Sequence, residues 1–217
     1  MKEIVLFDVD DTIIKGQSQK LFLDFLFKNK YISISYFLRL SLWFVFYKMG
    51  LIKNPKSAME YAFSFTKNKT ESDIAGIVDK FFSSTLVYKI YPEAKKIIKE
   101  HRDKGRSVVL VSNAVDVLIK KISSYLEADD FISTKLEIVD GVYTGNINGN
   151  IMYGETKKQS VENYIKSKGI TLDNSWAYGD HVSDIFLLSI VKNPYAINPS
   201  KELRKYANEK GWSIINF

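Results

Sequence analysis

The sequence predicts an α/β fold: a mostly parallel sheet with helices on both faces, interrupted near its start by an all-helical insertion. Three observations predict this fold. Short apolar runs typical of strands buried on both faces alternate with segments of helical length beyond residue 89. Residues 17–88 show no strand-like alternation. The basic excess of the chain also lies wholly within residues 15–88, which marks a separate module.

The core elements can be assigned in order along the chain. Ile4 to Phe7 is an apolar run that ends in acidic residues, as expected of a buried strand. Asp140-Gly141 and Asn148-Gly149 are turn dipeptides that favour hairpins. The remaining expected elements are helices at 92–104, 115–125, 156–168, 183–190 and 201–210, and strands at 107–111, 176–178, 195–197 and 212–215.

The insertion is expected to contain helices at 17–28 and 34–49, a helical segment after Pro55, and a helix at 70–86. Thr70 supplies an N-cap for the last of these, followed by acidic residues in its first turn. We therefore predict a core domain of residues 1–14 and 89–217 and a helical cap domain of residues 15–88.

Composition and charge exclude several classes of protein. The 217 residues include no cysteine, so disulfides, thiolate metal sites and a catalytic thiol are excluded. The 31 Lys and Arg exceed the 25 Asp and Glu by six, and residues 15–88 alone hold 11 basic and 5 acidic residues. An apolar basic stretch beside a neutral core does not resemble a surface that tracks nucleic-acid phosphates. No nucleic-acid partner is expected.

The stretch from Tyr31 to Tyr47 is apolar and aromatic, and Arg39 is its only charge. A bilayer span needs about 20 apolar residues, so this stretch is too short to cross a membrane. Three interpretations stay open: a buried core helix of the cap, a helix that docks on an anionic membrane surface or admits a lipid chain, and a dimer interface. The Ile4 to Phe7 run is too short for a signal peptide, so we expect a cytoplasmic protein, with peripheral contact at the inner membrane face as the alternative.

Polar residues follow three of the predicted strands. Asp8 and Asp10 come after the first strand, and their spacing of two points both side chains the same way. Ser112 and Asn113 follow the strand at 107–111, and Asp180 follows the strand at 176–178. Because ligands of such sheets bind at the carboxyl ends of the strands, we expect these side chains to share one site.

Four segments in order resemble the motifs of the haloacid dehalogenase (HAD) superfamily: DVDDT at 8–12, VLVSN at 109–113, Lys157 in GETK, and GDHVSD at 179–184. Their order, with a helical insertion directly after the first motif, is similar to the phosphoserine-phosphatase-like subfamily IB. The resemblance implies a Rossmann-like core with an inserted all-helical cap of the C1 type. It also implies a magnesium-dependent phosphomonoester hydrolase.

The resemblance further implies a role for each motif residue. Asp8 is the expected nucleophile that forms an aspartyl-phosphate, and Asp10 the expected acid and base. Mg²⁺ would be held by Asp8, the Asp10 carbonyl and Asp180, with Asp184 orienting its ligands. The predicted phosphate-binding residues are Ser112, Asn113 and Lys157, and Lys157 is also predicted to be catalytic.

Asp11 departs from the family pattern, in which glycine is usual at this position. Asp is among the few residues that tolerate a positive φ, so we expect it to adopt the same backbone conformation. His101 lies near the end of a charged helix and is expected to be solvated. His181 lies between two motif aspartates, where the family pattern requires no histidine, and contact with substrate or with solvent near the metal is only the minor alternative.

The expected substrate is a small organic phosphate or a phospholipid head-group phosphate. The cap contains few acidic residues, which argues against an amino-acid phosphate. The basic apolar stretch after the first motif also resembles the membrane-associated phosphatidylglycerophosphate phosphatases of the subfamily. Two other functions stay open: a phosphotransferase or mutase that uses the same aspartyl-phosphate, and a catalytically inactive protein that binds membrane surfaces.

Overall fold

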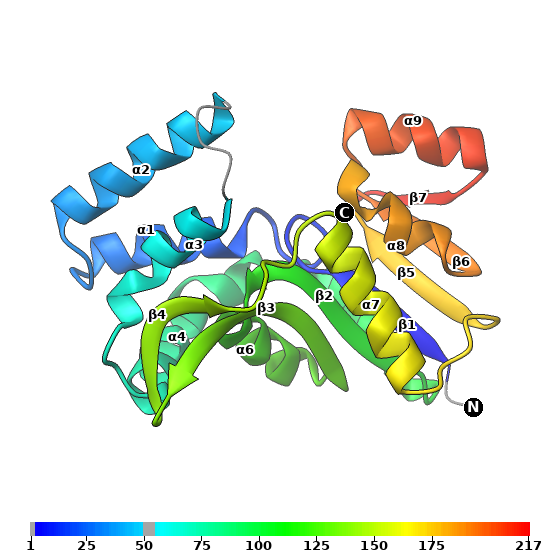
Figure 1. Ribbon diagram of the computed structural model, residues 1–217. Coiled ribbons are helices and arrows are strands. Elements are labelled where there is room, and N and C mark those ends of the chain that lie inside the picture. Colours follow the sequence, from blue (N-terminus) through cyan, green and yellow to red (C-terminus); the bar gives the residue numbers. More distant parts are fainter. Residues whose placement is uncertain (1–2, 50–54) are drawn as a thin grey trace.

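The computed structural model describes residues 3–49 and 55–217 and contains a seven-stranded sheet (Figure 1). The strand order is β4-β3-β2-β1-β5-β6-β7, and every neighbouring pair is parallel except β3 and β4. The strands are β1 (Ile4–Asp8), β2 (Ser107–Val115), β3 (Asp130–Val139), β4 (Val142–Asn148), β5 (Ser175–Gly179), β6 (Asn193–Ile197) and β7 (Ser213–Ile215).

Helices cover both faces of this sheet, as the sequence predicts. The described α-helices are α1 (Ser18–Lys28), α2 (Ile34–Lys48), α3 (Pro55–Phe63), α4 (Glu71–Ser84), α5 (Pro92–Asp103), α6 (Asp116–Leu126), α7 (Glu155–Ser167), α8 (Ile185–Ser189) and α9 (Lys201–Lys210). Short 3₁₀ helices lie at Ser64–Thr66, Leu86–Lys89 and Val182–Asp184.

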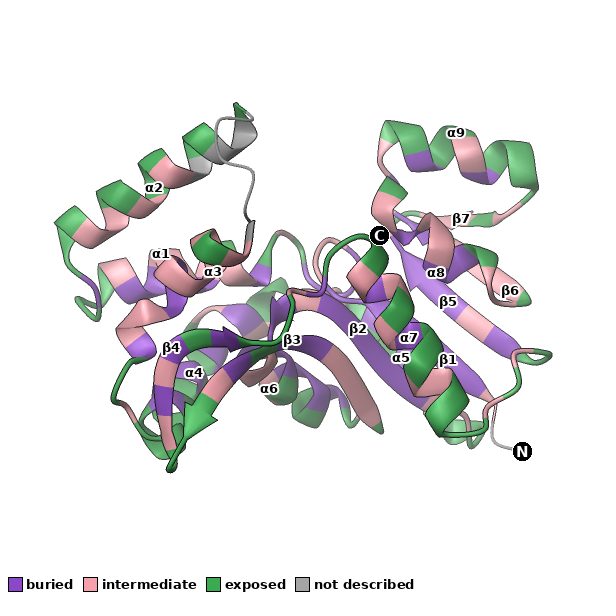
Figure 2. Cartoon of the chain, in the orientation of Figure 1, coloured by how far each residue is buried: buried purple, intermediate pink, exposed green. Residues whose placement is uncertain are grey.

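The alternation of side chains along β1 assigns two hydrophobic clusters to the two faces of the sheet. Val5 and Phe7 point into a cluster with residues of α5 and α6, which continues into α1 and α4. Ile4 and Leu6 point into a second cluster with residues of α7, α8 and α9. All five β1 residues are buried, so the strand carries Asp8 on a fixed backbone at the centre of the sheet (Figure 2).

The antiparallel pair β3 and β4 is joined at Asp140-Gly141. Both residues have positive φ, of 51° and 79°, which is the backbone of the tight hairpin turn that this dipeptide favours. The second predicted hairpin, at Asn148-Gly149, is wrong. Gly149 has a positive φ, but in the described part of the chain no strand pairs with β4 beyond Asn148, and an irregular segment leads to α7.

The helices after β1 divide into two groups. Helices α1, α2 and α3 lie together on one side of the molecule in Figure 1. Helix α4 packs instead against α6, and the Lys121 ammonium lies 2.7 Å from the Asp79 carboxylate. Thr70 and Asp73 form the reciprocal capping box at the start of α4, as their sequence predicts.

The insertion leaves and re-enters the core at one place. Ile14 and Ile90 form an antiparallel bridge. The Lys15 amide donates to the Lys89 carbonyl at 2.8 Å, and the Tyr91 amide donates to the Ile13 carbonyl at 2.9 Å. The division into residues 1–14 with 89–217 and residues 15–88 stays a prediction.

Helix α2 differs from the buried cap helix that was one of the expectations. None of its residues with a described side chain is buried (Figure 2). One face is apolar and exposed, and we call this the outer face of α2; its residues are Ile34, Leu38, Leu42, Val45, Phe46 and, just after the helix, Met49. Within residues 3–49 and 55–217 no helix combines the length and the apolarity required to cross a membrane.

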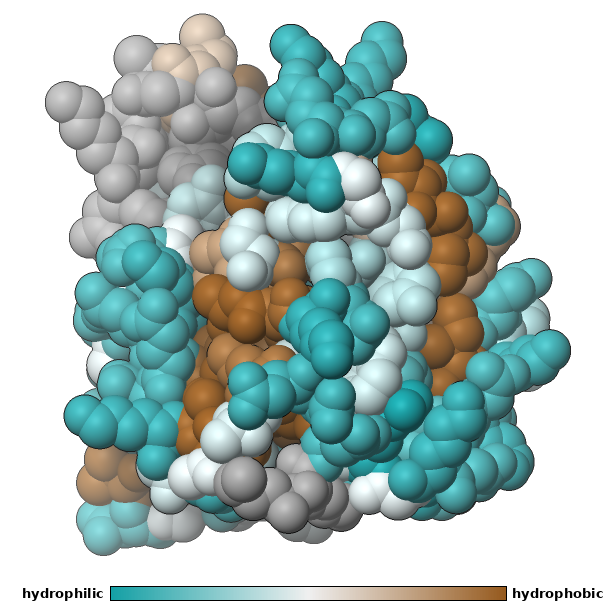
Figure 3. Space-filling view, turned by 90° about the vertical axis from the view of Figure 1, so that its right-hand side faces the viewer, coloured by the Kyte–Doolittle hydropathy of each residue, from teal (hydrophilic) through white to brown (hydrophobic). Residues whose placement is uncertain are grey.

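The opposite side of the molecule is built differently. The face that carries α9 is mostly hydrophilic in the space-filling view, and its hydrophobic atoms form bands between hydrophilic ones (Figure 3). Ser200 caps the start of α9 by accepting a hydrogen bond from the Leu203 amide, and α9 ends at Gly211 in the left-handed conformation.

The expectation that His101 is solvated is wrong. His101 is 6% exposed, and its Nε2 lies 2.7 Å from the Tyr178 hydroxyl. Its Nδ1 lies 3.1 Å from a guanidinium nitrogen of Arg106, and this guanidinium group also stacks on the Trp176 ring. Burial and the charge of Arg106 lower the pKa of His101 to about 4, so the ring is neutral at pH 7. The last turn of α5 is therefore docked against β5 by a buried histidine.

Candidate active site

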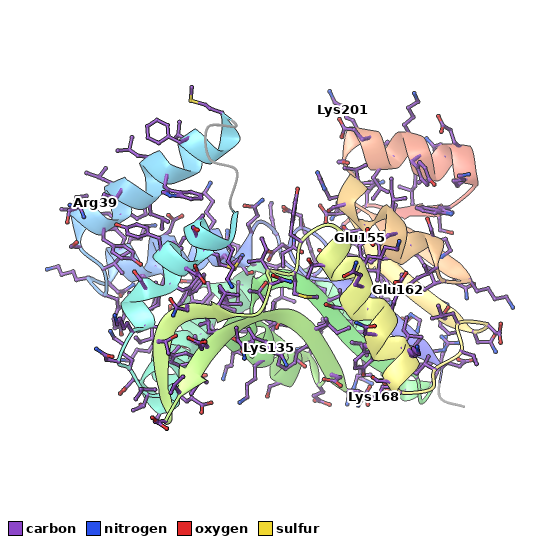
Figure 4. The ribbon with its side chains drawn as sticks, in the orientation of Figure 1. Arg39, Lys135, Glu155, Glu162, Lys168 and Lys201 are labelled. Atoms are coloured by element: carbon purple, nitrogen blue, oxygen red, sulfur yellow. The ribbon has the colours of Figure 1, made fainter. Side chains whose placement is uncertain are left out.

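Three adjacent strands bring the motif residues together. In the order β2-β1-β5, the carboxyl ends carry Ser112 and Asn113, Asp8, and Gly179 followed by Asp180. Helix α7 supplies Lys157 from its first turn, two residues after Glu155, which is labelled in Figure 4. All the predicted site residues line one cavity: Asp8, Asp10, Ser112, Asn113, Lys157, Asp180 and Asp184.

Lys157 lies between two carboxylates at the bottom of this cavity. Its ammonium donates to Asp8 Oδ1 at 2.6 Å and to Asp184 Oδ1 at 2.9 Å. The three side chains are 3%, 10% and 2% exposed. Burial alone would lower the pKa of Lys157, but the two carboxylates outweigh it and raise that pKa. Lys157 is therefore a permanent cation beside Asp8.

The site contains more carboxylate charges than this one cation can balance. Burial raises the pKa of Asp8, and the charges of Asp184 and Asp180 raise it further against the opposing effect of Lys157. Burial and the charges of Asp184 and Asp11 raise the pKa of Asp180 to about 7. Crowded acids of this kind repel one another, so a bound cation would stabilise all of them.

Oxygen ligands of Asp8, Asp180 and Asp184 lie within 4.8 Å of one another. Hard carboxylate oxygens in a buried, electronegative cluster are the donors that Mg²⁺ takes in proteins. The residues present therefore fit a divalent cation. The sequence prediction placed Asp8 and Asp180 among the metal ligands and Asp184 behind them, whereas Asp184 lies close enough to belong to the same cluster.

Asp10 occupies a different environment from Asp8. Its Oδ1 accepts a hydrogen bond from the Ser18 amide at the start of α1, at 2.8 Å. Burial raises its pKa, and the hydrogen bond to Ser18 only partly opposes this effect. The carboxyl group thus holds a proton more readily than an exposed aspartate does, while it faces the same cavity as Asp8.

Asp11 adopts the backbone conformation expected from its position in the motif. Its φ is 59°, and its Oδ1 accepts from the Gly16 amide at 2.8 Å. The side chain therefore closes the loop after β1 by a hydrogen bond that glycine lacks.

The other two phosphate-binding candidates, Ser112 and Asn113, line the same cavity as Lys157. Ser112 is buried, and its Oγ accepts from the Ala114 amide at 3.1 Å, which leaves its hydroxyl hydrogen for another acceptor. The Asn113 carbonyl accepts from Thr134, while its side-chain Oδ1 is buried without a hydrogen-bond partner among the described residues. Both residues line the cavity beside Asp8. His181 also lines it, with Nδ1 3.1 Å from the Ser183 hydroxyl.

Sequence reasoning missed the roles of two residues. The Thr12 hydroxyl donates to Asp180 Oδ1 at 3.2 Å and links the first motif to the last. A Cβ on Gly179 would lie 2.8 Å from the Asp184 Cβ, so only glycine leaves Asp184 in place. Both residues belong to the quoted motifs, and a glycine at a strand end next to acidic residues is a signal of such close approach.

Comparisons with known proteins agree with the four motifs. The chain matches the family of haloacid dehalogenase-like hydrolases over residues 5–189. It is 30% identical over 214 residues to the inhibition of morphological differentiation protein of Streptomyces azureus, which covers 97% of this chain and 77% of that one. It is 28% identical over 216 residues to a phosphoserine phosphatase of Mycobacterium tuberculosis, with 97% and 70% covered. Over 222 residues it is 25% identical to a histidinol-phosphatase of Neisseria meningitidis, with both chains covered completely.

Solved structures share the fold. A protein of unknown function from Bordetella pertussis superimposes with a TM-score of 0.90 at 25% identity, over 99% of both chains. A substrate-bound phosphoserine phosphatase complex gives a TM-score of 0.67 at 20% identity, over 99% of this chain and 93% of that one. The predicted Rossmann-like core with a mostly parallel sheet and a helical insertion is confirmed.

Proposed function

Because the chain belongs to the haloacid dehalogenase-like hydrolase family, we propose that it is a magnesium-dependent phosphomonoester hydrolase that forms an aspartyl-phosphate on Asp8. The pairing of Asp8 with Lys157 at 2.6 Å, beside the acidic residues Asp180 and Asp184, carries the proposal. Relatives named as phosphatases support the reaction class. A small organic phosphate and a phospholipid head-group phosphate are both substrates of this class.

In the first half-reaction, the Asp8 carboxylate oxygen that does not accept from Lys157 attacks phosphorus, and the bond from phosphorus to the ester oxygen breaks. The leaving oxygen takes the proton of the Asp10 carboxyl group. Because its pKa is raised by burial, the Asp10 carboxyl group keeps this proton to a higher pH than an exposed aspartate does. Lys157 orients Asp8 through its hydrogen bond and offsets negative charge on the transferred phosphoryl group.

In the second half-reaction, the Asp10 carboxylate takes a proton from a water molecule. The water oxygen attacks phosphorus, and the bond between phosphorus and the Asp8 oxygen breaks. Inorganic phosphate leaves and Asp8 is regenerated as a carboxylate. Ser112 and Asn113 line the cavity where the equatorial phosphate oxygens would lie, and the Ser112 hydroxyl is the donor available to them.

A magnesium ion held by Asp8, Asp180 and the Asp10 carbonyl, with Asp184 beside it, would neutralise the acids and the substrate phosphate. Asp184 also accepts from the His181 amide at 3.2 Å, which fixes its carboxylate in the loop after β5. Thr12 fixes Asp180 in the same way. These contacts hold the acidic residues in place before any ligand binds.

Hydrolysis of p-nitrophenyl phosphate, with and without Mg²⁺, tests the proposal. We expect Asp8→Asn to lower kcat by about 10³-fold or more, whereas Asp11→Asn, which keeps both the acceptor oxygen and the positive φ, retains most activity. Acid-quenched protein should carry one phosphoryl group on the peptide that contains Asp8. Equal rates for the parent and Asp8→Asn would overturn the proposal. Phosphate diverted to added alcohols would identify phosphotransfer rather than hydrolysis.

A further inference from the structure

The active-site cavity extends far beyond the catalytic residues. Its volume is about 740 Å³, in the range that accommodates drug-sized organic molecules. The end at the sheet carries the acidic residues and Lys157, whereas the end beneath α2 is lined by apolar side chains: Leu23, Phe37, Leu40, Trp43, Met59 and Phe63. One continuous cavity thus has a polar end and an apolar end.

We infer that the substrate is a phosphate monoester attached to an extended apolar group, and that the cap holds this group beneath α2. The inference rests on the proposed function. Among the cavity-lining residues of the described cap, only Lys20 and Asp24 carry a charge. A small amino-acid phosphate would leave most of the apolar lining without contact. An apolar chain of the substrate would instead cover this lining and remove the apolar surface of both from water.

The packing of α2 explains why this space persists. The Phe37 ring stacks on Phe27 of α1 with centroids 4.4 Å apart, and the Tyr36 ring stacks on Tyr61 of α3 at 5.1 Å. The Tyr36 hydroxyl also donates to the Tyr61 carbonyl. These contacts attach the first half of α2 to its neighbours. Leu40 and Trp43 follow on the same helix, remain partly exposed and border the cavity.

A chain-length series tests the inference. The substrates are glycerol 3-phosphate and its 1-acyl derivatives of increasing length, all below their micelle-forming concentrations, with naphthyl phosphate, histidinol phosphate and phosphoserine as further arms. We expect kcat/KM to rise by about fourfold per methylene while the added group is being buried, and then to level off. Naphthyl phosphate as the preferred substrate would identify an aryl group rather than an alkyl chain as the apolar group.

A kcat/KM that is independent of chain length, or highest for phosphoserine or histidinol phosphate, would overturn the inference. Hydrolysis of p-nitrophenyl phosphate in the same preparation would then show that the proposed function still holds. If p-nitrophenyl phosphate hydrolysis is equal in Asp8→Asn, the proposed function fails instead. The two failures are therefore distinguishable.

Two positions on α2 provide a matched pair of variants. Leu40 lines the cavity, whereas Leu38 points outward and is 53% exposed. We expect Leu40→Gln to lower kcat/KM for the long-chain substrate by about tenfold and that for glycerol 3-phosphate, which has no apolar chain, by much less. Leu38→Gln should change neither rate with monomeric substrate. Equal long-chain rates for both variants would contradict binding of the chain beneath α2.

The outer face of α2 carries a second, independent inference. Five of its six apolar residues, Ile34, Leu38, Leu42, Phe46 and Met49, are 44% to 65% exposed and recur every three or four positions, so they form one face of the helix. The sixth, Val45, is also exposed but borders the cavity as well. The sequence from Phe25 to Met59 contains six basic residues and no acidic one. Lys28, Lys30 and Arg39 are exposed there, and Arg39 is labelled on α2 in Figure 4.

We propose that the outer face of α2 docks on the surface of an anionic bilayer. An exposed apolar helix face within a basic stretch that lacks acidic residues is suited to the surface of an anionic membrane. A second copy of this chain would instead place these basic groups against one another. At 15 residues α2 is suited to lie along a bilayer surface, and it is too short to span one.

Sedimentation with phosphatidylcholine vesicles, with and without phosphatidylglycerol, tests the docking at low and high salt. We expect binding to the anionic vesicles at low salt and at least about a tenfold loss of binding in Leu38→Glu/Leu42→Glu. Glu202→Gln/Glu209→Gln on α9, which lies in the other part of the fold, should bind as the parent does. Absence of binding at low salt would overturn the proposal, as would a concentration-dependent dimer that the α2 variant abolishes.

Discussion

The sheet core buries ionisable side chains against hydrogen-bonding partners, whereas the cap exposes apolar side chains. Lys157, Asp184 and His101 are each less than a tenth exposed, and each has a partner within 3.1 Å. Leu38 and Leu42 of α2 are more than half exposed. Phosphoryl transfer requires charges at fixed positions, whereas contact with an apolar group requires area more than geometry. The comparison agrees with the proposed division between chemistry at the sheet and contact with an apolar group at the cap.

After Asp8, the largest effect is expected at Lys157. Replacement by Met leaves Asp8 and Asp184 without their shared cation, so we expect kcat to fall by about 10³-fold with saturating Mg²⁺. Lys158→Met is the matched control, because Lys158 lies one residue along the same helix and is 40% exposed. Steady-state kinetics of both variants measures the difference, and comparable losses would remove the distinction between buried and exposed cations.

His101 tests the same comparison through pH. Its folded pKa of about 4 lies below the unfolded value of 6.5, so the unfolded chain binds the proton first as pH falls. The stability that neutral His101 provides is therefore lost between pH 6.5 and pH 4, by about 3 kcal/mol. Urea denaturation at pH 7 and pH 4 measures it. His101→Gln should lose less stability than the parent over that interval, and an equal loss in both would contradict the assignment.

Gly179→Ala should lower kcat by less than Lys157→Met does. The added Cβ meets the Cβ of Asp184 at 2.8 Å, so this side chain, which accepts a hydrogen bond from Lys157, must shift. Because this carboxylate lies beside the reacting groups, we expect its displacement to lower kcat by about 10²-fold. Gly76→Ala on α4 is the control, because nothing lies within 4 Å of its added Cβ. Full activity in Gly179→Ala would show that the site tolerates movement of Asp184.

The smallest effects are expected on α2. Phe37→Ala removes a ring stacked at 4.4 Å on Phe27, and we expect it to lower the free energy of unfolding by about 2 kcal/mol. Leu38→Ala, on the outer face, should change it by less than about 0.5 kcal/mol. Urea midpoints give both values. A large loss in Leu38→Ala would mean that the outer face is covered in the folded protein.

The sequence predicted the core, and the convergence of the motif residues on one cavity, because both depend on local patterns. The apolar runs give β1 and β2, and polar residues directly after parallel strands meet at one edge whatever the details of packing. Asp11 shows the same locality: its positive φ follows from its place in the loop and from its side chain.

The features that were missed depend on distant parts of the chain. His101 lies in a charged stretch, yet Tyr178 and Arg106 bury and satisfy it, and only the packing of α5 on the sheet reveals them. The apolar surface of α2 exceeds what α1 and α3 cover, which no periodicity shows. The interpretation of α2 as a buried core helix was wrong for this reason.

The bridge between Ile14 and Ile90 has a consequence for how such proteins diversify. Because the two ends of the helical insertion are held side by side, a change in its length alters the loop-closure entropy only slightly. The register of β1 with β2, which positions Asp8, is formed entirely by residues outside the insertion. New substrate specificities can therefore evolve by exchange of the insertion while the strands that carry the site residues are retained.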